Sequence, residues 1–215
     1  MAYDVVIFDL DGTLLDTLDD LMDSCNYALS TIGAPPRTRA EIRRFVGNGI
    51  RNLMLQAVPD GEDNPKFEQA YETMQTWYKA HNQIKTAPYP GVQRLIRTLK
   101  QQGVPMAVVS NKPDASVQML VEQWFPEITF GLGEREGLRR KPERDMVDYA
   151  IAQLGQTGKK TVYVGDSEVD LTTAANAGLD CISVTWGFRD RALLVERGAK
   201  QFADTAEDLL QLIQG

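Results

Sequence analysis

The stretch DVVIFDLDGTLLDT, residues 4–17, decides the fold because it joins a short apolar run directly to two closely spaced carboxylates. The run VVIF (5–8) shows no alternation of polar and apolar side chains, which is typical of a strand covered on both faces. Asp9 and Asp11 follow, and strand alternation predicts that both point to the same side. Unpaired carboxylates are costly to bury, so the stretch predicts a site in which other groups share their charge.

Three later runs resemble the first one, namely MAVV (106–109), TVYV (161–164) and CISV (181–184). Helical patterns flank and separate them, at residues 92–103, 115–125, 144–155 and 171–178. Strands that alternate with helices favour right-handed crossovers and a parallel sheet. We therefore predict an α/β fold with a doubly wound, Rossmann-like parallel sheet.

Residues 15–85 break this alternation, because they contain amphipathic helical patterns and no clear strand. TRAE (38–41) is a capping box, GNG (47–49) interrupts the next pattern, and TAPYPG (86–91) is typical of a linker. The sequence thus predicts an α/β core of residues 1–15 and 87–215, and an inserted all-helical cap domain of residues 16–86. The hinges are expected near residues 15–16 and 87–91.

Composition narrows the class of protein. The chain is 43% hydrophobic and 25% charged, as in ordinary globular proteins, and its net charge of −7 argues against general nucleic-acid binding. No run approaches the ~18 apolar residues of a membrane-spanning helix, and no signal-peptide pattern is expected. We expect a cytoplasmic protein without a membrane or nucleic-acid partner, a monomer by default with a dimer as the alternative. One histidine, His81, excludes a histidine-rich zinc site and favours acid–base chemistry by carboxylates.

Polar side chains follow three of the predicted strands. Asp9 ends the first, Ser110 and Asn111 end the second, and Asp166 ends the third. The carboxyl ends of parallel strands form the ligand-binding edge of such a sheet, so these groups are expected to meet there.

The charge of this edge requires cations. Asp9, Asp11, Asp166 and Asp170 would carry about −4 together when ionised, and carboxylate oxygens are ligands that suit Mg²⁺. Lys141, in RRKP (139–142), supplies a further positive group, and Pro142 predicts a helix that begins beside it.

In chain order, DLDGT (9–13), SN (110–111), KP (141–142) and GDSEVD (165–170) match the four motifs of the haloacid dehalogenase-like hydrolase superfamily. With VGNGIRNL (46–53) and YPGV (89–92), the sequence resembles the phosphoglycolate phosphatase-like branch. The resemblance implies a Mg²⁺-dependent phosphomonoesterase that hydrolyses a small phosphorylated metabolite through an aspartyl-phosphate intermediate.

The resemblance also implies roles for single residues. Asp9 is the expected nucleophile, and Asp11 the group that protonates the leaving alcohol and then deprotonates water. The Asp9 carboxylate, the Asp11 main-chain carbonyl and Asp166 are the expected Mg²⁺ ligands, while Asp170 orients water on the metal. The phosphate-binding residues implied are Gly12, Thr13, Ser110, Asn111 and Lys141. Arg144 stands where relatives commonly have a proline.

The helical insert offers weaker candidates. Gly47, Asn48 and Arg51 are expected to contribute to substrate specificity, with Arg51 pairing with a second anionic group such as a carboxylate. The sequence leaves three alternatives open: a β-phosphoglucomutase-like phosphotransferase, a pyrophosphatase, or a non-catalytic phosphate-binding module.

Overall fold

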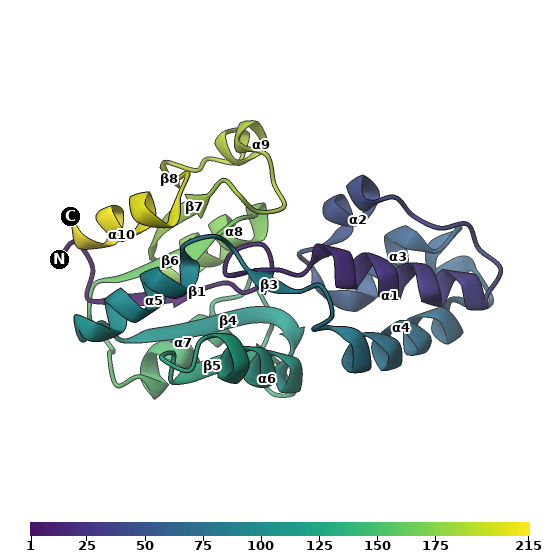
Figure 1. The fold of residues 1–215 in the computed structure, drawn as a ribbon, viewed down its shortest axis with the longest axis horizontal. Helices are drawn as coiled ribbons and strands as arrows, with labels where there is room; N and C mark the ends of the chain where they lie inside the picture. The colour runs from purple at the N-terminus through teal and green to yellow at the C-terminus, as the bar shows by residue number, and fades with distance from the viewer. The chain divides into compact units, whose positions relative to one another are not determined.

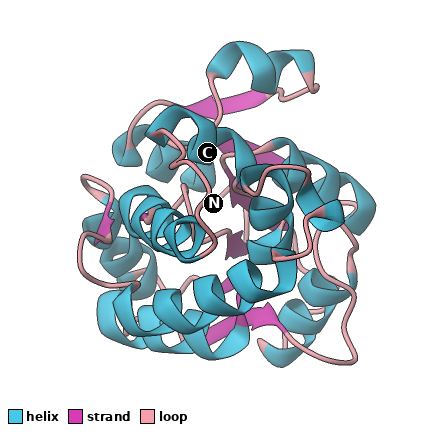
Figure 2. Cartoon of the chain, turned by 90° about the vertical axis from the view of Figure 1, so that its right-hand side faces the viewer, coloured by secondary structure: helices cyan, strands magenta, loops and turns pink.

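A computed structural model describes all residues, 1–215. Contacts divide the chain into two compact units, an α/β unit of residues 1–15 and 88–215 and a helical unit of residues 16–87. Figure 1 follows the chain through both units, and Figure 2 shows how much of it is helical. No helix has the length and apolar character that a membrane crossing would require.

The α/β unit is built on a six-stranded sheet with the order β5-β4-β1-β6-β7-β8, in which all neighbours are parallel. This confirms the predicted α/β fold class. The strands are β1 (Val5–Phe8), β4 (Met106–Pro113), β5 (Phe130–Glu134), β6 (Thr161–Gly165), β7 (Asp180–Val184) and β8 (Gln201–Ala203). The sequence patterns did not reveal β5, which contains two glycines, or β8, which has three residues.

Helices cover both faces of this sheet because the strand residues alternate between two apolar cores. Val6 and Phe8 of β1 belong to one core and Val5 and Ile7 to the other. The first core is completed by α5 (Val92–Gln101), α6 (Asp114–Trp124) and α10 (Ala206–Gln214), and the second by α7 (Asp145–Gln153) and α8 (Glu168–Ala177). A short helix, α9 (Arg191–Glu196), joins β7 to β8.

The helical unit contains four helices and one short 3₁₀ turn: α1 (Leu18–Thr31), α2 (Arg39–Phe45), α3 (Gly49–Ala57), η1 (Gly61–Asp63) and α4 (Phe67–His81). The predicted capping box is present, since Thr38 and Glu41 bond each other's backbone at the start of α2. The predicted break falls between α2 and α3, where Asn48 is the N-cap of α3.

A buried carboxylate joins the two ends of the helical unit. Asp20, on α1, accepts hydrogen bonds from the backbone of Lys85 (3.0 Å) and Thr86 (2.9 Å) and from the Thr86 hydroxyl (2.8 Å). Beside them, the connecting segments β2 (Leu15–Asp16) and β3 (Ala87–Pro88) pair as a two-stranded sheet.

Candidate active site

The site starts at a tight turn after β1. The Asp9 amide still bonds the Val164 carbonyl of β6 (2.9 Å), and the amides of residues 13–15 then converge on the Leu10 carbonyl. Gly12 has a φ of +85°, and a Cβ built there would lie 2.5 Å from a carboxylate oxygen of Asp166. Glycine is therefore required for both its backbone angle and the close approach of Asp166.

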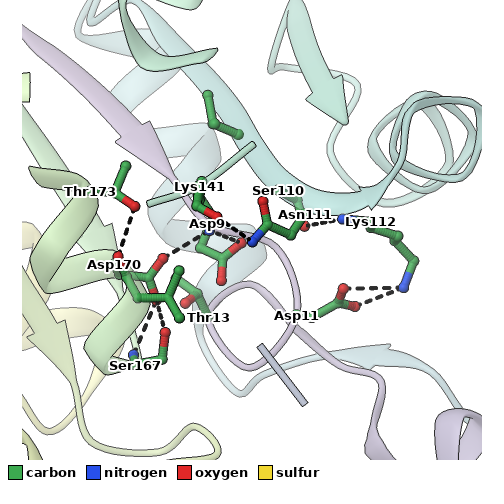
Figure 3. Close-up of polar contacts among 12 residues, drawn as sticks. Asp9, Asp11, Thr13, Ser110, Asn111, Lys112, Lys141, Ser167, Asp170 and Thr173 are labelled. Atoms are coloured by element: carbon green, nitrogen blue, oxygen red, sulfur yellow. Dashed lines mark hydrogen bonds and ion pairs between the residues drawn. The ribbon is translucent and has the colours of Figure 1, made fainter. Parts of the chain in front are cut away.

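Three carboxylates meet at the carboxyl ends of β1 and β6. Asp9, Asp166 and Asp170 are all buried, and each offers an oxygen within 4.8 Å of the others. The Lys141 ammonium lies between two of them, 2.8 Å from Asp9 and 2.8 Å from Asp170 (Figure 3). Two of the three carboxylates thus share a single lysine, and Asp166 has no ion pair with it, so negative charge exceeds the positive charge in direct contact with the group.

The pKa values follow from this excess of negative charge. Burial raises the pKa of Asp9 to about 7, against the lowering effect of Lys141 and with a further increase from Asp170. Burial and the neighbouring carboxylates raise the pKa of Asp166 well above its ordinary value. For Lys141, burial lowers the pKa, but Asp170 and Asp9 outweigh it and the net pKa is well above the usual one. A divalent cation, which prefers oxygen ligands, fits this donor set and its charge.

Asp170 differs from the other two carboxylates because protein donors already surround it. Besides Lys141 it accepts bonds from the Tyr163 hydroxyl (3.3 Å), the Ser167 hydroxyl (2.6 Å) and amide (3.1 Å), and the Asp166 amide (3.2 Å). The bond from the Ser167 amide belongs to the capping box of α8, in which Ser167 is the N-cap and Asp170 the third helical residue. Asp170 is therefore held in place more firmly than a carboxylate that is open to a metal.

Asp166 is fixed from two sides. One oxygen accepts the Thr13 hydroxyl (3.2 Å), and the other accepts the Phe188 amide (2.7 Å) from the loop after β7. The Trp186 indole of that loop donates to the Thr13 carbonyl (3.0 Å). Thr13, expected to bind phosphate, directs its hydroxyl to Asp166.

Asp9 and Asp11 have different ion-pair partners, Lys141 for Asp9 and Lys112 for Asp11. Because β1 ends at Phe8, Asp11 lies in the turn, and its carboxylate is directed to Lys112 (Figure 3). The Lys112 ammonium is 2.9 Å and 3.2 Å from the two Asp11 oxygens.

The end of β4 is tied to the segment that carries Lys141. The Asn111 side-chain amide donates to the Lys141 carbonyl (3.0 Å), and the Ser110 hydroxyl accepts the Lys112 amide (3.3 Å). The expectation that a helix begins beside Lys141 is wrong, because α7 begins at Asp145. Arg144, the departure from the usual motif, is the N-cap of α7 and pairs with Asp148 (2.6 Å).

Arg51 has partners within the helical unit. Its guanidinium binds Glu68 (2.6 Å) and Glu62 (3.0 Å) and lies 5.0 Å from the centre of the Phe67 ring. Any substrate anion bound by Arg51 would have to compete with two carboxylates. Its predicted role in specificity, like those of Gly47 and Asn48, stays a prediction.

Sequence reasoning missed two residues of the site, Lys112 and Tyr163. Tyr163 is buried within β6, and its hydroxyl accepts a bond from Lys141 (3.0 Å). Lys112 directly follows the SN pair that the sequence had singled out, and this adjacency was the available signal. For Tyr163 the sequence offered no such signal, since this residue lies inside an apolar run.

Comparisons with known proteins agree with one another. A family model of haloacid dehalogenase-like hydrolases matches residues 6–184. The phosphoglycolate phosphatase of Pseudomonas putida is 33% identical over 194 residues, covering 86% of this chain and 70% of that protein. The one from Pseudomonas fluorescens is 31% identical, covering 98% and 79%.

Two solved structures are also similar. A protein of Lactobacillus delbrueckii subsp. bulgaricus, provisionally named a phosphoglycolate phosphatase, is 39% identical with a TM-score of 0.94, and 99% of each chain is covered. A predicted phosphoglycolate phosphatase of Haemophilus somnus is 26% identical with a TM-score of 0.90, covering 99% of this chain and 98% of that one.

Proposed function

Because the chain belongs to the haloacid dehalogenase-like hydrolase family, we propose that it is a Mg²⁺-dependent phosphomonoesterase that acts on phosphoglycolate or a similar small phosphate ester. The observation that carries the proposal is the buried group of Asp9, Asp166 and Asp170 around Lys141. A structural ion pair would need one carboxylate for one lysine, whereas this group places three buried carboxylates around one lysine, and a bound divalent cation would balance the remaining negative charge.

In the first step Asp9 is the nucleophile. One carboxylate oxygen contacts Lys141 at 2.8 Å, so the ammonium fixes the direction of the carboxylate. An Asp9 oxygen forms a bond to phosphorus as the bond from phosphorus to the ester oxygen breaks. Asp11 donates a proton to the departing alkoxide, which leaves as the alcohol.

In the second step water hydrolyses the aspartyl-phosphate. Asp11, now a carboxylate, accepts a proton from the attacking water, and phosphate and the free Asp9 carboxylate result. Lys141, Ser110 and the backbone amides near Gly12 and Asn111 hold the phosphoryl oxygens through both steps.

The residues that would hold Mg²⁺ are Asp9, Asp166 and the Asp11 main-chain carbonyl. Asp170, whose oxygens accept hydrogen bonds from Lys141 and Ser167, would not ligate the ion directly but would orient water molecules bound to it. The ion, when bound, supplies positive charge to the phosphoryl oxygens.

The helical unit serves as a cap in this proposal, opening at the segments β2 and β3 to admit substrate and one water molecule. The protein acts as a cytoplasmic monomer, and its partner is the phosphorylated metabolite.

The test uses 2-phosphoglycolate and an aryl phosphate with Mg²⁺. The wild-type protein hydrolyses both, excess EDTA abolishes turnover, and acid quenching traps a phosphoenzyme. Asp9→Asn removes turnover and trapping. Asp4→Asn is the matched control, because Asp4 lies at the opposite end of β1, where its carboxylate accepts a hydrogen bond from the Lys160 amide (3.1 Å). Full activity in EDTA, or normal turnover by the Asp9 variant, contradicts the proposal.

A further inference from the structure

Lys112 is a buried lysine at the site, and the mechanism above does not use it. Its side chain is 2% exposed, and its ammonium contacts both oxygens of Asp11, which is 16% exposed. A lysine that merely neutralised a surface carboxylate would remain largely in water. Lys112 instead holds its charge beside the group that passes the proton to the leaving alcohol.

The backbone fixes the position of this lysine. The pairing of β4 with β5 is interrupted between Val109 and Pro113, and the Lys112 amide bonds the Ser110 hydroxyl. Gly133 of β5 packs against this segment so closely that an added Cβ would lie 2.5 Å from the Lys112 carbonyl. The lysine therefore lies at a closely packed strand end.

We propose that Lys112 is a specificity-determining residue that binds a carboxylate carried by the leaving alcohol. The inference rests on the proposed function and deepens it, because it assigns the recognition of the leaving group to the α/β unit. The ligand class is a phosphate ester of a 2-hydroxycarboxylic acid, in which the carboxylate lies two carbon atoms from the ester oxygen.

The distances support this class of ligand. To receive its proton, the ester oxygen must lie about 2.6–3.0 Å from an Asp11 oxygen. That oxygen is 2.9 Å from the Lys112 ammonium. Within the substrate, the ester oxygen and a carboxylate oxygen on the adjacent carbon lie about 3 Å apart, as standard bond lengths require. A charge-assisted hydrogen bond of about 2.8 Å, donated by the Lys112 ammonium to the substrate carboxylate, would complete a ring of four contacts of similar length.

Charge points the same way. A phosphoglycolate brings a phosphate and a carboxylate, and Lys141 is already shared between Asp9 and Asp170. Arg51, the earlier candidate for the carboxylate, is paired with Glu62 and Glu68. All three cations already have carboxylate partners, and Lys112, whose partner is Asp11, is the one beside the carboxylate that donates the proton in the proposed mechanism, where the leaving group must lie.

The experiment compares 2-phosphoglycolate with 2-hydroxyethyl phosphate, in which a neutral hydroxymethyl group replaces the carboxylate. Lys112→Met is expected to lower kcat/KM for both esters, because Asp11 loses its partner. The readout is the ratio of the two values, which should fall by about 100-fold, the loss typical of truncating one member of a buried charge pair. Lys112→Arg should restore part of the ratio, and Lys79→Met, on the exposed face of α4, should leave it unchanged.

Equal losses for the two esters overturn the inference, since Lys112 would then act only through Asp11. A wild-type enzyme that hydrolyses both esters equally well also overturns it, while the proposed function stands. A wild-type enzyme that hydrolyses neither ester nor an aryl phosphate overturns the proposed function itself. If Lys112→Met does not fold, Lys112→Gln replaces it in the comparison of the two esters. Product inhibition of the wild-type enzyme gives a second measurement, in which glycolate should inhibit at least tenfold more strongly than ethylene glycol. Equal inhibition by the two compounds contradicts the inference.

Discussion

Gly12→Ala tests how closely the turn after β1 must approach Asp166. Gly12 and Gly103 both have positive φ angles, +85° and +74°. A Cβ at Gly103 meets nothing within 4 Å, whereas a Cβ at Gly12 would lie 2.5–2.8 Å from three atoms of the Asp166 carboxylate. Gly103→Ala is thus the matched control, since it adds a Cβ at a positive φ angle without a clash with neighbouring atoms.

The magnitudes can be worked out from these contacts. A left-handed backbone angle costs a residue with a Cβ about 1–2 kcal/mol, and this applies to both variants. In Gly12→Ala the carboxylate must also move by about 1 Å to reach an ordinary contact distance. Its bonds to the Phe188 amide (2.7 Å) and the Thr13 hydroxyl (3.2 Å) would then weaken, each worth about 1.5–3 kcal/mol. We expect a free energy of unfolding reduced by about 3–5 kcal/mol in Gly12→Ala and about 1 kcal/mol in Gly103→Ala.

The assay combines urea denaturation of both variants with turnover as a function of Mg²⁺ concentration. Since Asp166 is a proposed ligand, Gly12→Ala should raise the Mg²⁺ concentration for half-maximal activity by about tenfold or more. Gly103→Ala should leave it unchanged. Equal stability of the two variants, together with equal Mg²⁺ dependence, would refute the reasoning.

Three further outcomes are expected. Asp20→Ala leaves the buried Thr86 amide and hydroxyl without an acceptor, so the free energy of unfolding measured in urea should fall by about 3 kcal/mol. Asp23→Ala is the control, since it removes only an exposed ion pair and should lower that free energy by less than about 1 kcal/mol. The pKa of Asp9, raised by burial to about 7, means that the folded, metal-free protein holds a proton that the unfolded chain releases above about pH 4. With EDTA present, stability should therefore fall as pH rises from about 4 to about 7 and level off above 7, and Asp9→Asn should show a shallower fall in urea titrations across that range. Arg51→Ala should change kcat/KM for 2-phosphoglycolate and an aryl phosphate by the same factor; a selective loss for phosphoglycolate would return Arg51 to the specificity role.

Much of the fold could be predicted because local signals and tertiary packing agree. The apolar runs of β1, β4, β6 and β7 are buried on both faces, so hydrophobicity alone reveals them. In β5 the glycines leave little apolar signal, since Gly131 and Gly133 are there to let α6 and the end of β4 come close. The capping box of α2 needs only neighbouring residues and was predictable for that reason.

The candidate site was predictable to the level of residue type and strand end. Asp9, Asp166, Asp170 and Lys141 meet in the structure, as topology led us to expect, although their catalytic roles stay predictions. Side-chain direction was not predictable, because Asp11 lies in a turn whose path depends on long-range contacts. Its partner Lys112 is 101 positions away in the chain, and no local pattern records such a contact.

The hydrogen bonds of Asp20 bear on how this chain can be rearranged. They join the first turn of α1 to residues 85–86, so the helical unit enters and leaves at neighbouring points and closes on itself there. A segment with adjacent, self-bonded ends can be exchanged between host chains with little disturbance of either. The α/β unit can therefore acquire a different insert at this position while Asp9, Asp166, Asp170 and the two lysines stay unchanged. Substrate range can then diversify by replacement of a whole inserted unit as well as by single substitutions.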